Sequence, residues 1–136
     1  MVGMVTTQWE ELLRLRRVVL AEPSAADIHD LRVASRRLRA ALETLAPVLG
    51  KDRTRRLRQP IRQLTRELGQ LRNLDEARSY LLGLDEAWLA PLTAALEQQQ
   101  HTELGRIQRM LEKLPCKRLD HRVRRAIQRL LIAEQR

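Results

Sequence analysis

The stretch Ile28–Leu45, IHDLRVASRRLRAALETL, decides the fold of this chain. Its mainly apolar row recurs every three or four residues, the spacing of one face of an α-helix. The row comprises Ile28, Leu31, Ser35, Leu38, Leu42 and Leu45. A basic row lies one position further along and comprises His29, Arg32, Arg36 and Arg39, with Arg37 next to it. One position is a rotation of about 100°, so the basic row flanks the buried face over about 15 Å. It is suited to a polyanion, although a solvated basic face would have the same pattern.

A second stretch, from about Asp52 to Leu82, repeats this arrangement. Its apolar row is Leu57, Ile61, Leu64, Leu68 and Leu71. The next row contains Arg58, Arg62, Thr65, Gly69 and Arg72, with Arg55 ahead of it and Arg66 beside it. A short turn at residues 50–52 predicts that the two helices are antiparallel neighbours, whose basic rows can enclose one groove. Pro60 predicts either a bend or a late start of this helix.

Prolines and glycines divide the rest of the chain into helices. After a loose start over residues 1–5, we expect a helix capped by Thr6 or Thr7 that ends before Pro23. Ser24 is the expected N-cap of the next helix, which ends near residues 47–50. The fold class is therefore an all-α antiparallel bundle of about four to five helices, in a single domain over residues 1–136.

Two further helices are expected in the C-terminal half. The first begins between Gly83 and Pro91 and ends near Leu114. Its candidate core residues are Leu89, Leu92, Leu96, Ile107, Met110 and Leu111. The second follows Pro115, and its apolar row is flanked by Arg118, Arg122, Arg125 and Arg129. This C-terminal basic row could extend the site, contact a partner chain or keep the end soluble, and the pattern favours the solvated face.

The charge of the chain points to an anionic partner. The formal net charge is +9 at pH 7, which attracts nucleic acid, an acidic membrane surface or an inorganic polyanion. The basic character is regional, because residues 79–105 contain no Lys or Arg. Two Trp, one Tyr and no Phe leave few platforms for base stacking. The sequence has no apolar run long enough to span a membrane and no signal-peptide pattern, so we expect a cytoplasmic protein.

Catalytic and metal-binding motifs are missing from the sequence. His29, His101 and His121 are not spaced as metal ligands, and the single Cys116 excludes a cysteine cluster. There is no glycine-rich phosphate loop and no nucleophile elbow. We therefore expect no enzyme activity, no metal and no cofactor. His29 could donate to phosphate when protonated, or be a neutral group at the edge of the core.

Two segments resemble the motifs of the CHAD family, the conserved-histidine α-helical domain. Residues 29–39, HDLRVASRRLR, resemble its first motif, and residues 68–75, LGQLRNLD, resemble its second, with Asn73 where the family commonly has Asp. The resemblance implies an all-helical fold that binds inorganic polyphosphate without catalysis. His29, Arg32, Arg36, Arg37 and Arg39 match the first motif and Arg72 the second, whereas Arg58, Arg62 and Arg66 follow from the helical pattern alone.

The family's usual domain has two similar helical halves around a basic channel, and this chain resembles the first half. A homodimer that rebuilds the second half by two-fold symmetry is therefore expected, and the alternatives are a truncated form of a longer chain or a half-domain that works alone. The predicted function is a non-catalytic module that binds inorganic polyphosphate or another polyanion. The alternatives are a helical protein that binds the nucleic-acid backbone, and a structural helix-bundle assembly protein.

Overall fold

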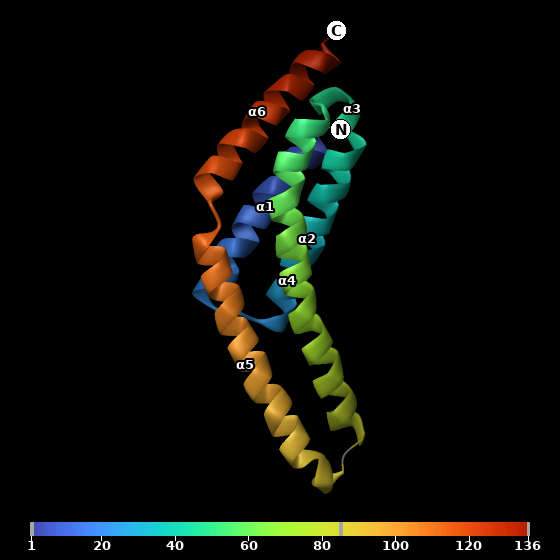
Figure 1. The fold of residues 1–136 in the computed structure, drawn as a ribbon, viewed down its shortest axis with the longest axis vertical. Coiled ribbons are helices and arrows are strands. Elements are labelled where there is room, and N and C mark those ends of the chain that lie inside the picture. Colours follow the sequence, from blue (N-terminus) through green and yellow to red (C-terminus); the bar gives the residue numbers. More distant parts are fainter. Residues whose placement is uncertain (1, 85, 136) are drawn as a thin grey trace.

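The computed structural model describes residues 2–84 and 86–135, and these form helices without any β-strand. The elements are α1 (Val2–Ala21), α2 (Ala25–Thr44), α3 (Ala46–Leu49), α4 (Lys51–Leu84), the 3-10 helix η1 (Ala87–Leu89), α5 (Ala90–Lys113) and α6 (Cys116–Glu134). Figure 1 shows that α1, α2, α6 and the first half of α4 pack side by side, with both termini at the same end. The expected all-α bundle is thus confirmed.

The first helix starts earlier than the sequence pattern suggested. A loose start is wrong for residues 2–5, because α1 begins at Val2, while Met1 lies outside the described residues. The physical reason is burial: Val2 and Val5 continue the apolar row of Trp9 and Leu12, and all four side chains are buried in the core. Burial of that row outweighs the weak capping signal of Thr6 and Thr7.

The N-cap of α2 is the one that the sequence predicts. The Ser24 hydroxyl oxygen accepts a hydrogen bond from the backbone N–H of Asp27 at 3.1 Å, and the hydroxyl donates to the Asp27 carboxylate at 2.8 Å. The same carboxylate lies in the first turn of α2, where the helix dipole favours negative charge. This cap fixes the start of the helix that supplies the first basic row.

The connection between α2 and α4 contains the short helix α3 and one strained position. Gly50 has φ of 91°, a left-handed conformation that suits glycine, and its N–H donates to the Ala46 carbonyl at 2.8 Å. The chain reverses here, so α4 returns antiparallel to α2 and packs against it. All five residues of the predicted apolar row of α4 are buried.

Helix α4 runs without interruption from Lys51 to Leu84, so a late start at Pro60 is wrong. Proline removes one backbone donor inside a helix, which is normally unfavourable. The buried neighbours Leu57, Ile61 and Leu64 hold this part of α4 against the core despite that loss.

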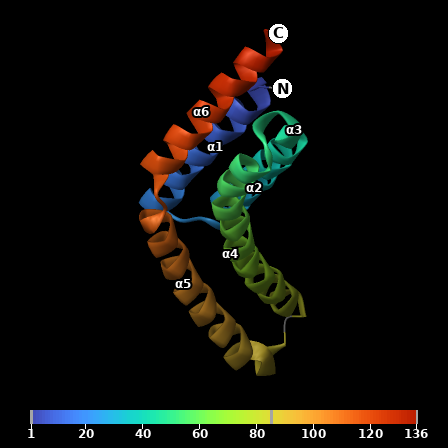
Figure 2. The same ribbon diagram turned by 45° about the horizontal axis from the view of Figure 1, so that its top comes forward.

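The second half of α4 and most of α5 extend beyond the other helices as a helical hairpin (Figures 1 and 2). We call residues 72–84 and 86–106 the arm, and residues 2–71 and 107–135 the body. Within the arm only Leu89 is buried, whereas the body contains the rest of the core. The expectation that Leu92 belongs to the core is wrong, since its side chain is 50% exposed. The arm is a hairpin of α4 and α5, and no further described helix lies over it (Figure 1).

Candidate functional site

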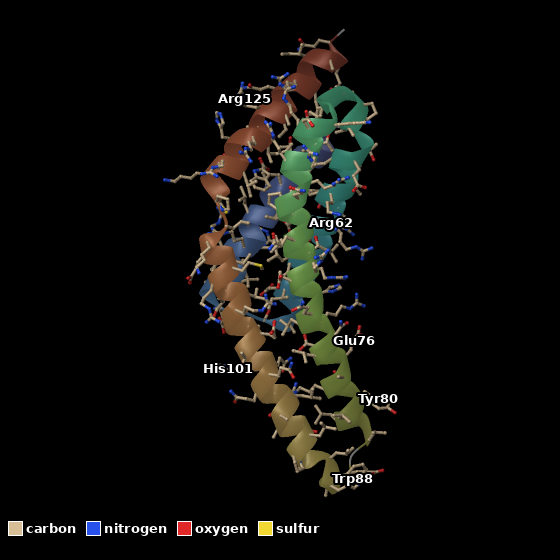
Figure 3. All side chains as sticks on the ribbon, in the orientation of Figure 1. Arg62, Glu76, Tyr80, Trp88, His101 and Arg125 are labelled. Atoms are coloured by element: carbon tan, nitrogen blue, oxygen red, sulfur yellow. The ribbon has the colours of Figure 1, made fainter. Side chains whose placement is uncertain are left out.

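A groove of about 720 Å³ lies between α2 and α4. Five arginines line it, Arg32 and Arg39 from α2 and Arg62, Arg66 and Arg72 from α4. Thr65, Gly69, Gln70, Asn73 and Glu76 complete its lining. The two helices run antiparallel, so their basic rows meet along one line, and Figure 3 labels Arg62 in the first half of α4. Guanidinium groups from separate helices therefore converge on one surface.

A pair of buried hydroxyl groups joins the two helices beneath the groove. Ser35 on α2 and Thr65 on α4 lie 2.7 Å apart, oxygen to oxygen. Ser35 Oγ also lies 2.7 Å from the Arg32 carbonyl, and Thr65 Oγ1 lies 2.9 Å from the Ile61 carbonyl. The two hydroxyl groups have two protons for these three contacts, so one hydroxyl donates to the other across the helices and the second donates to a backbone carbonyl of its own helix. Neither hydroxyl is left without a partner, and the pair fixes α2 against α4 at this level.

The Arg32 side chain crosses from α2 to lie against Gly69 of α4. A Cβ atom added at Gly69 would be 3.4 Å from Arg32 Nε and 3.9 Å from Arg32 Nη2, which is already ordinary contact. The Arg32 guanidinium therefore packs directly over Gly69, where a Cβ atom would just touch it. Arg32 Nε is buried and has no hydrogen-bond partner among the described residues.

The groove holds more positive than negative charge. Glu76 is its one carboxylate, and it accepts a hydrogen bond from Arg72 Nε at 3.0 Å. No carboxylate of the described residues lies within 4 Å of the charged nitrogens of Arg32, Arg39, Arg62 or Arg66. Their mutual repulsion favours an anion in the groove, and Arg forks bind phosphate oxygens in a bidentate manner.

His29 lies at the end of the groove, in a small recess of about 30 Å³ that Arg32, Arg72 and Asp75 also line. Asp75 accepts a hydrogen bond from the Gln100 side chain on α5. Partial burial raises the pKa of Asp75, although the positive charge of Arg78 opposes that shift. The exposed imidazole of His29 adds one more hydrogen-bond donor beside Arg32 and Arg72.

Three of the predicted site residues lie apart from the groove lining. Arg36 and Arg37 line a separate depression of α2 with Val33 and Ala40. Arg58 forms an ion pair with Glu43 of α2, Nη1 to Oε1 at 3.5 Å, and its buried Nε has no partner among the described residues. Six of the predicted site residues therefore lie along one continuous surface formed by the groove and its adjoining recess: His29, Arg32, Arg39, Arg62, Arg66 and Arg72. Arg36, Arg37 and Arg58 lie outside it.

Sequence reasoning missed the polar neighbours and a second basic cluster. Gln70, Asn73 and Glu76 lie one or two turns from the arginines on the exposed side of α4, and helical spacing from Arg66 and Arg72 was the available signal. In addition, Arg122, Arg125 and Arg129 of α6 line a hollow together with Arg53 and Arg56 of α4. Only the packing of α6 beside the start of α4 brings these two segments together.

The described residues contain no group of three or more His, Cys, Asp or Glu side chains arranged to hold a metal ion.

Burial raises the pKa of the Cys116 thiol, although the positive charge of Arg16 opposes that shift. Across residues 2–84 and 86–135, no helix combines the length and the apolar character that crossing a bilayer requires.

The fold and the groove define an all-helical, strongly basic protein with an arginine-lined surface between two antiparallel helices. Comparison with known families matches residues 3–136 to the CHAD domain, so the chain belongs to this family and the resemblance seen in its motifs is confirmed. No curated protein and no solved structure matches the chain.

Proposed function

We propose that this protein binds inorganic polyphosphate in the α2–α4 groove and does not catalyse a reaction on it. The observation that carries the proposal is the convergence of Arg32, Arg39, Arg62, Arg66 and Arg72 on one groove with a single carboxylate. Membership of the CHAD family, which is associated with polyphosphate binding, supports the choice of ligand. A linear chain of phosphates presents repeated oxygens of the kind that arginine binds best.

The groove suits an extended ligand. Arg62 and Arg72 are ten residues apart on α4, which is about 15 Å along a helix. Contacts on this scale recognise phosphate repeatedly and read no other feature of the ligand. We therefore expect affinity to rise with chain length until the groove is filled, and to fall steeply with salt concentration as bound counterions are released.

A nucleic-acid backbone offers the same phosphate groups, but the aromatic residues do not favour it. Trp9 is buried, whereas Tyr80 and Trp88 lie on the arm, away from Arg62 (Figure 3). Without an aromatic platform in the groove, bases add nothing to backbone contacts. Competition between polyphosphate and duplex DNA at one salt concentration separates the two ligands, and preferential DNA binding would contradict the proposal.

The direct test is calorimetric titration with long-chain polyphosphate. We expect Arg62→Glu combined with Arg66→Glu to lower the affinity by about 100-fold or more, because two attractive contacts become repulsive. Arg17→Glu combined with Arg118→Glu is the matched control, since it changes the net charge by the same amount and both arginines are exposed and lie outside the groove lining. Equal loss in the control would show that net charge alone governs binding. Phosphate release by the purified protein with Mg²⁺ would contradict the non-catalytic part of the proposal.

We also propose that two copies associate as a homodimer. The large apolar side chains that the fold leaves exposed support this, because several of them gather on the arm. These are Tyr80, Leu82, Leu84, Trp88 and Leu92. An exposed apolar group of this kind is typical of an interface. Sedimentation at micromolar concentration is the test, and a monomeric mass would count against the dimer.

A further inference from the structure

The hollow between α4 and α6 is a second place where arginines from separate helices meet. It encloses about 250 Å³ and is lined by Arg53 and Arg56 of α4 and by Arg122, Arg125 and Arg129 of α6. Its two apolar lining residues, Leu57 and Ala126, are each 3% exposed. The five cationic groups thus surround an apolar floor, which strengthens their electrostatic effect relative to open solvent.

This hollow lies on the other side of α4 from the α2–α4 groove. Arg56 and Arg58 are two residues apart, a rotation of about 200° around the helix. Arg56 lines the hollow beside α6, whereas Arg58 pairs with Glu43 of α2. No residue lines both the hollow and the groove. The two basic surfaces are therefore separate.

The arginines of the hollow differ from their sequence neighbours in having no acidic partner. Arg55 pairs with Asp52 at 3.5 Å, and Arg124 pairs with Asp120 at 3.2 Å. By contrast, none of the five arginines that line the hollow forms an ion pair with a described residue. Arg122, Arg125 and Arg129 follow the spacing of one helix face, and they meet Arg53 and Arg56 across the hollow. Their charges repel one another until an anion enters.

We propose that the α4–α6 hollow is a second anion site, which binds a short chain of phosphate groups independently of the α2–α4 groove. Arginine forks and the lack of any carboxylate among the described lining residues select a multiply charged phosphate anion. The small volume selects a short one. The proposal does not require that the groove bind polyphosphate.

A recess next to the hollow has room for an organic group attached to the phosphates. It measures about 550 Å³, shares Arg56 and Arg122 with the hollow, and adds Lys113. Its remaining lining is largely apolar or uncharged, and comprises Gln59, Pro60, Gln63, Leu64, Met110, Leu114 and Pro115. A free oligophosphate would use the hollow alone, whereas an organic body attached to the phosphates would lie in the recess.

Calorimetric titration with sodium tripolyphosphate tests the proposal on the full chain. The test variant is Arg122→Gln combined with Arg125→Gln, and the matched control is Arg118→Gln on the same helix, outside the lining. All three positions are exposed, so the substitutions remove charge without opening the core. Thermal unfolding followed by circular dichroism checks that each variant folds like the wild type.

We expect the affinity of the hollow for tripolyphosphate to fall by about tenfold or more in the double variant. The Arg118→Gln control should bind tripolyphosphate like the wild type. A companion variant, Arg62→Gln with Arg66→Gln, should retain that site. The companion variant is also titrated with long-chain polyphosphate. If its affinity for that ligand equals that of the wild type, the function proposed for the groove fails while the second site stands. Identical titration curves for the double variant and the Arg118→Gln control would overturn the second site.

Titration with adenosine triphosphate then separates the two sources of phosphate. Tighter binding than tripolyphosphate, lost in the double variant, would assign the recess to an organic group that carries the phosphates. Equal or weaker binding, also lost in the double variant, would assign the hollow to a free oligophosphate. Identical adenosine triphosphate titration curves for the double variant and the Arg118→Gln control would contradict the site, because any binding to the α2–α4 groove is common to both variants.

Discussion

The body and the arm of this protein are built on opposite principles, although α4 runs through both. In sequence, residues 72–106 contain three arginines and six acidic residues, so the rest of the chain carries more than the whole net charge of +9. Each arginine of the arm has an acidic partner: Arg72 pairs with Glu76, Arg78 with Glu97, and Arg106 with Glu67 and Glu103. The groove arginines of the body and all five arginines of the α4–α6 hollow have no acidic partner among the described residues, so Arg72 is the one groove arginine that is paired.

Burial follows the same division. The body holds a continuous core from α1 to α6, whereas the arm buries only Leu89 among its described residues. The body is thus stable enough to tolerate the repulsion of unpaired arginines, and the arm relies on paired charges between two helices. We infer that global stability and most of the anion-binding surface reside in the body, while the arm opens locally at lower free energy.

The largest expected difference between the two regions is in the free energy of unfolding. Leu68 is fully buried between α4 and its neighbours, so Leu68→Ala should cost about 2–5 kcal/mol. Leu96 on α5 is only half-buried, and Leu96→Ala should cost less than about 1.5 kcal/mol. Urea unfolding followed by circular dichroism measures both. Equal losses would show that the arm shares the cooperative core, and would break the comparison.

Much of the body follows from the sequence because its apolar rows are regular. The rows of α2, α4 and α6 are buried where helical periodicity places them, and Ser24 caps α2 as expected. The departures arise where a local signal meets tertiary packing. Pro60 lies within a continuous helix because its neighbours are buried, and Leu92 stays exposed because the arm has no second layer.

The site was harder to predict than the fold. Helical spacing shows on which side of a helix a basic row lies, but it does not show where each long side chain points. Arg32 and Arg36 belong to one row, yet Arg32 lies against Gly69 while Arg36 lines another depression. Pairing with acids also depends on the register between helices, as in Arg58 with Glu43. The α4–α6 hollow joins residues about 70 positions apart, which periodicity within one helix cannot reveal.

A smaller difference is expected from the threonine hydroxyls of the two regions. Thr65 in the body is buried and bonds to Ser35 across two helices, so Thr65→Val should cost about 1–2 kcal/mol. Thr102 in the arm is exposed and bonds only to the Gln98 carbonyl of its own helix. Thr102→Val should change the free energy of unfolding by less than about 0.5 kcal/mol. The same urea series measures both, and a neutral Thr65→Val would mean that the hydroxyl pair does not fix α2 against α4.

The ion pair at the boundary of body and arm should limit the affinity of the groove. Arg72 is held by Glu76, whose carboxylate also repels an anion in the same groove. Glu76→Gln should therefore raise polyphosphate affinity by about three- to tenfold in calorimetry, because it frees one guanidinium and removes one negative charge. Glu97→Gln, which releases Arg78 further along the arm, is the control and should leave affinity unchanged. A gain of equal size in the control would mean that net charge governs affinity and that the boundary pair has no special place.

Two aspartates provide the finest comparison, because their pKa values shift in opposite directions. In the body, the hydrogen bond from Trp9 Nε1 at 2.8 Å lowers the pKa of Asp120, with Arg124 assisting. In the arm, burial raises the pKa of Asp75. A lowered pKa means that the Asp120 carboxylate stabilises the fold above its ordinary pKa, about 3.9, and that this contribution is lost as the pH falls through its folded value. A raised pKa means that the charged form of Asp75 opposes folding at neutral pH, and that this cost disappears in acid.

Asp120→Asn should therefore lower the free energy of unfolding at pH 7, and Asp75→Asn should leave it unchanged or raise it, each by less than about 1 kcal/mol because both groups are partly exposed. Both differences from the wild type should shrink below about pH 3, where the two carboxyls are protonated in the unfolded chain. Thermal unfolding measured from about pH 2 to about pH 7 covers both limits. If the two variants respond to pH with the same sign, body and arm do not differ in how they hold a carboxylate. The distinction would then rest on burial alone.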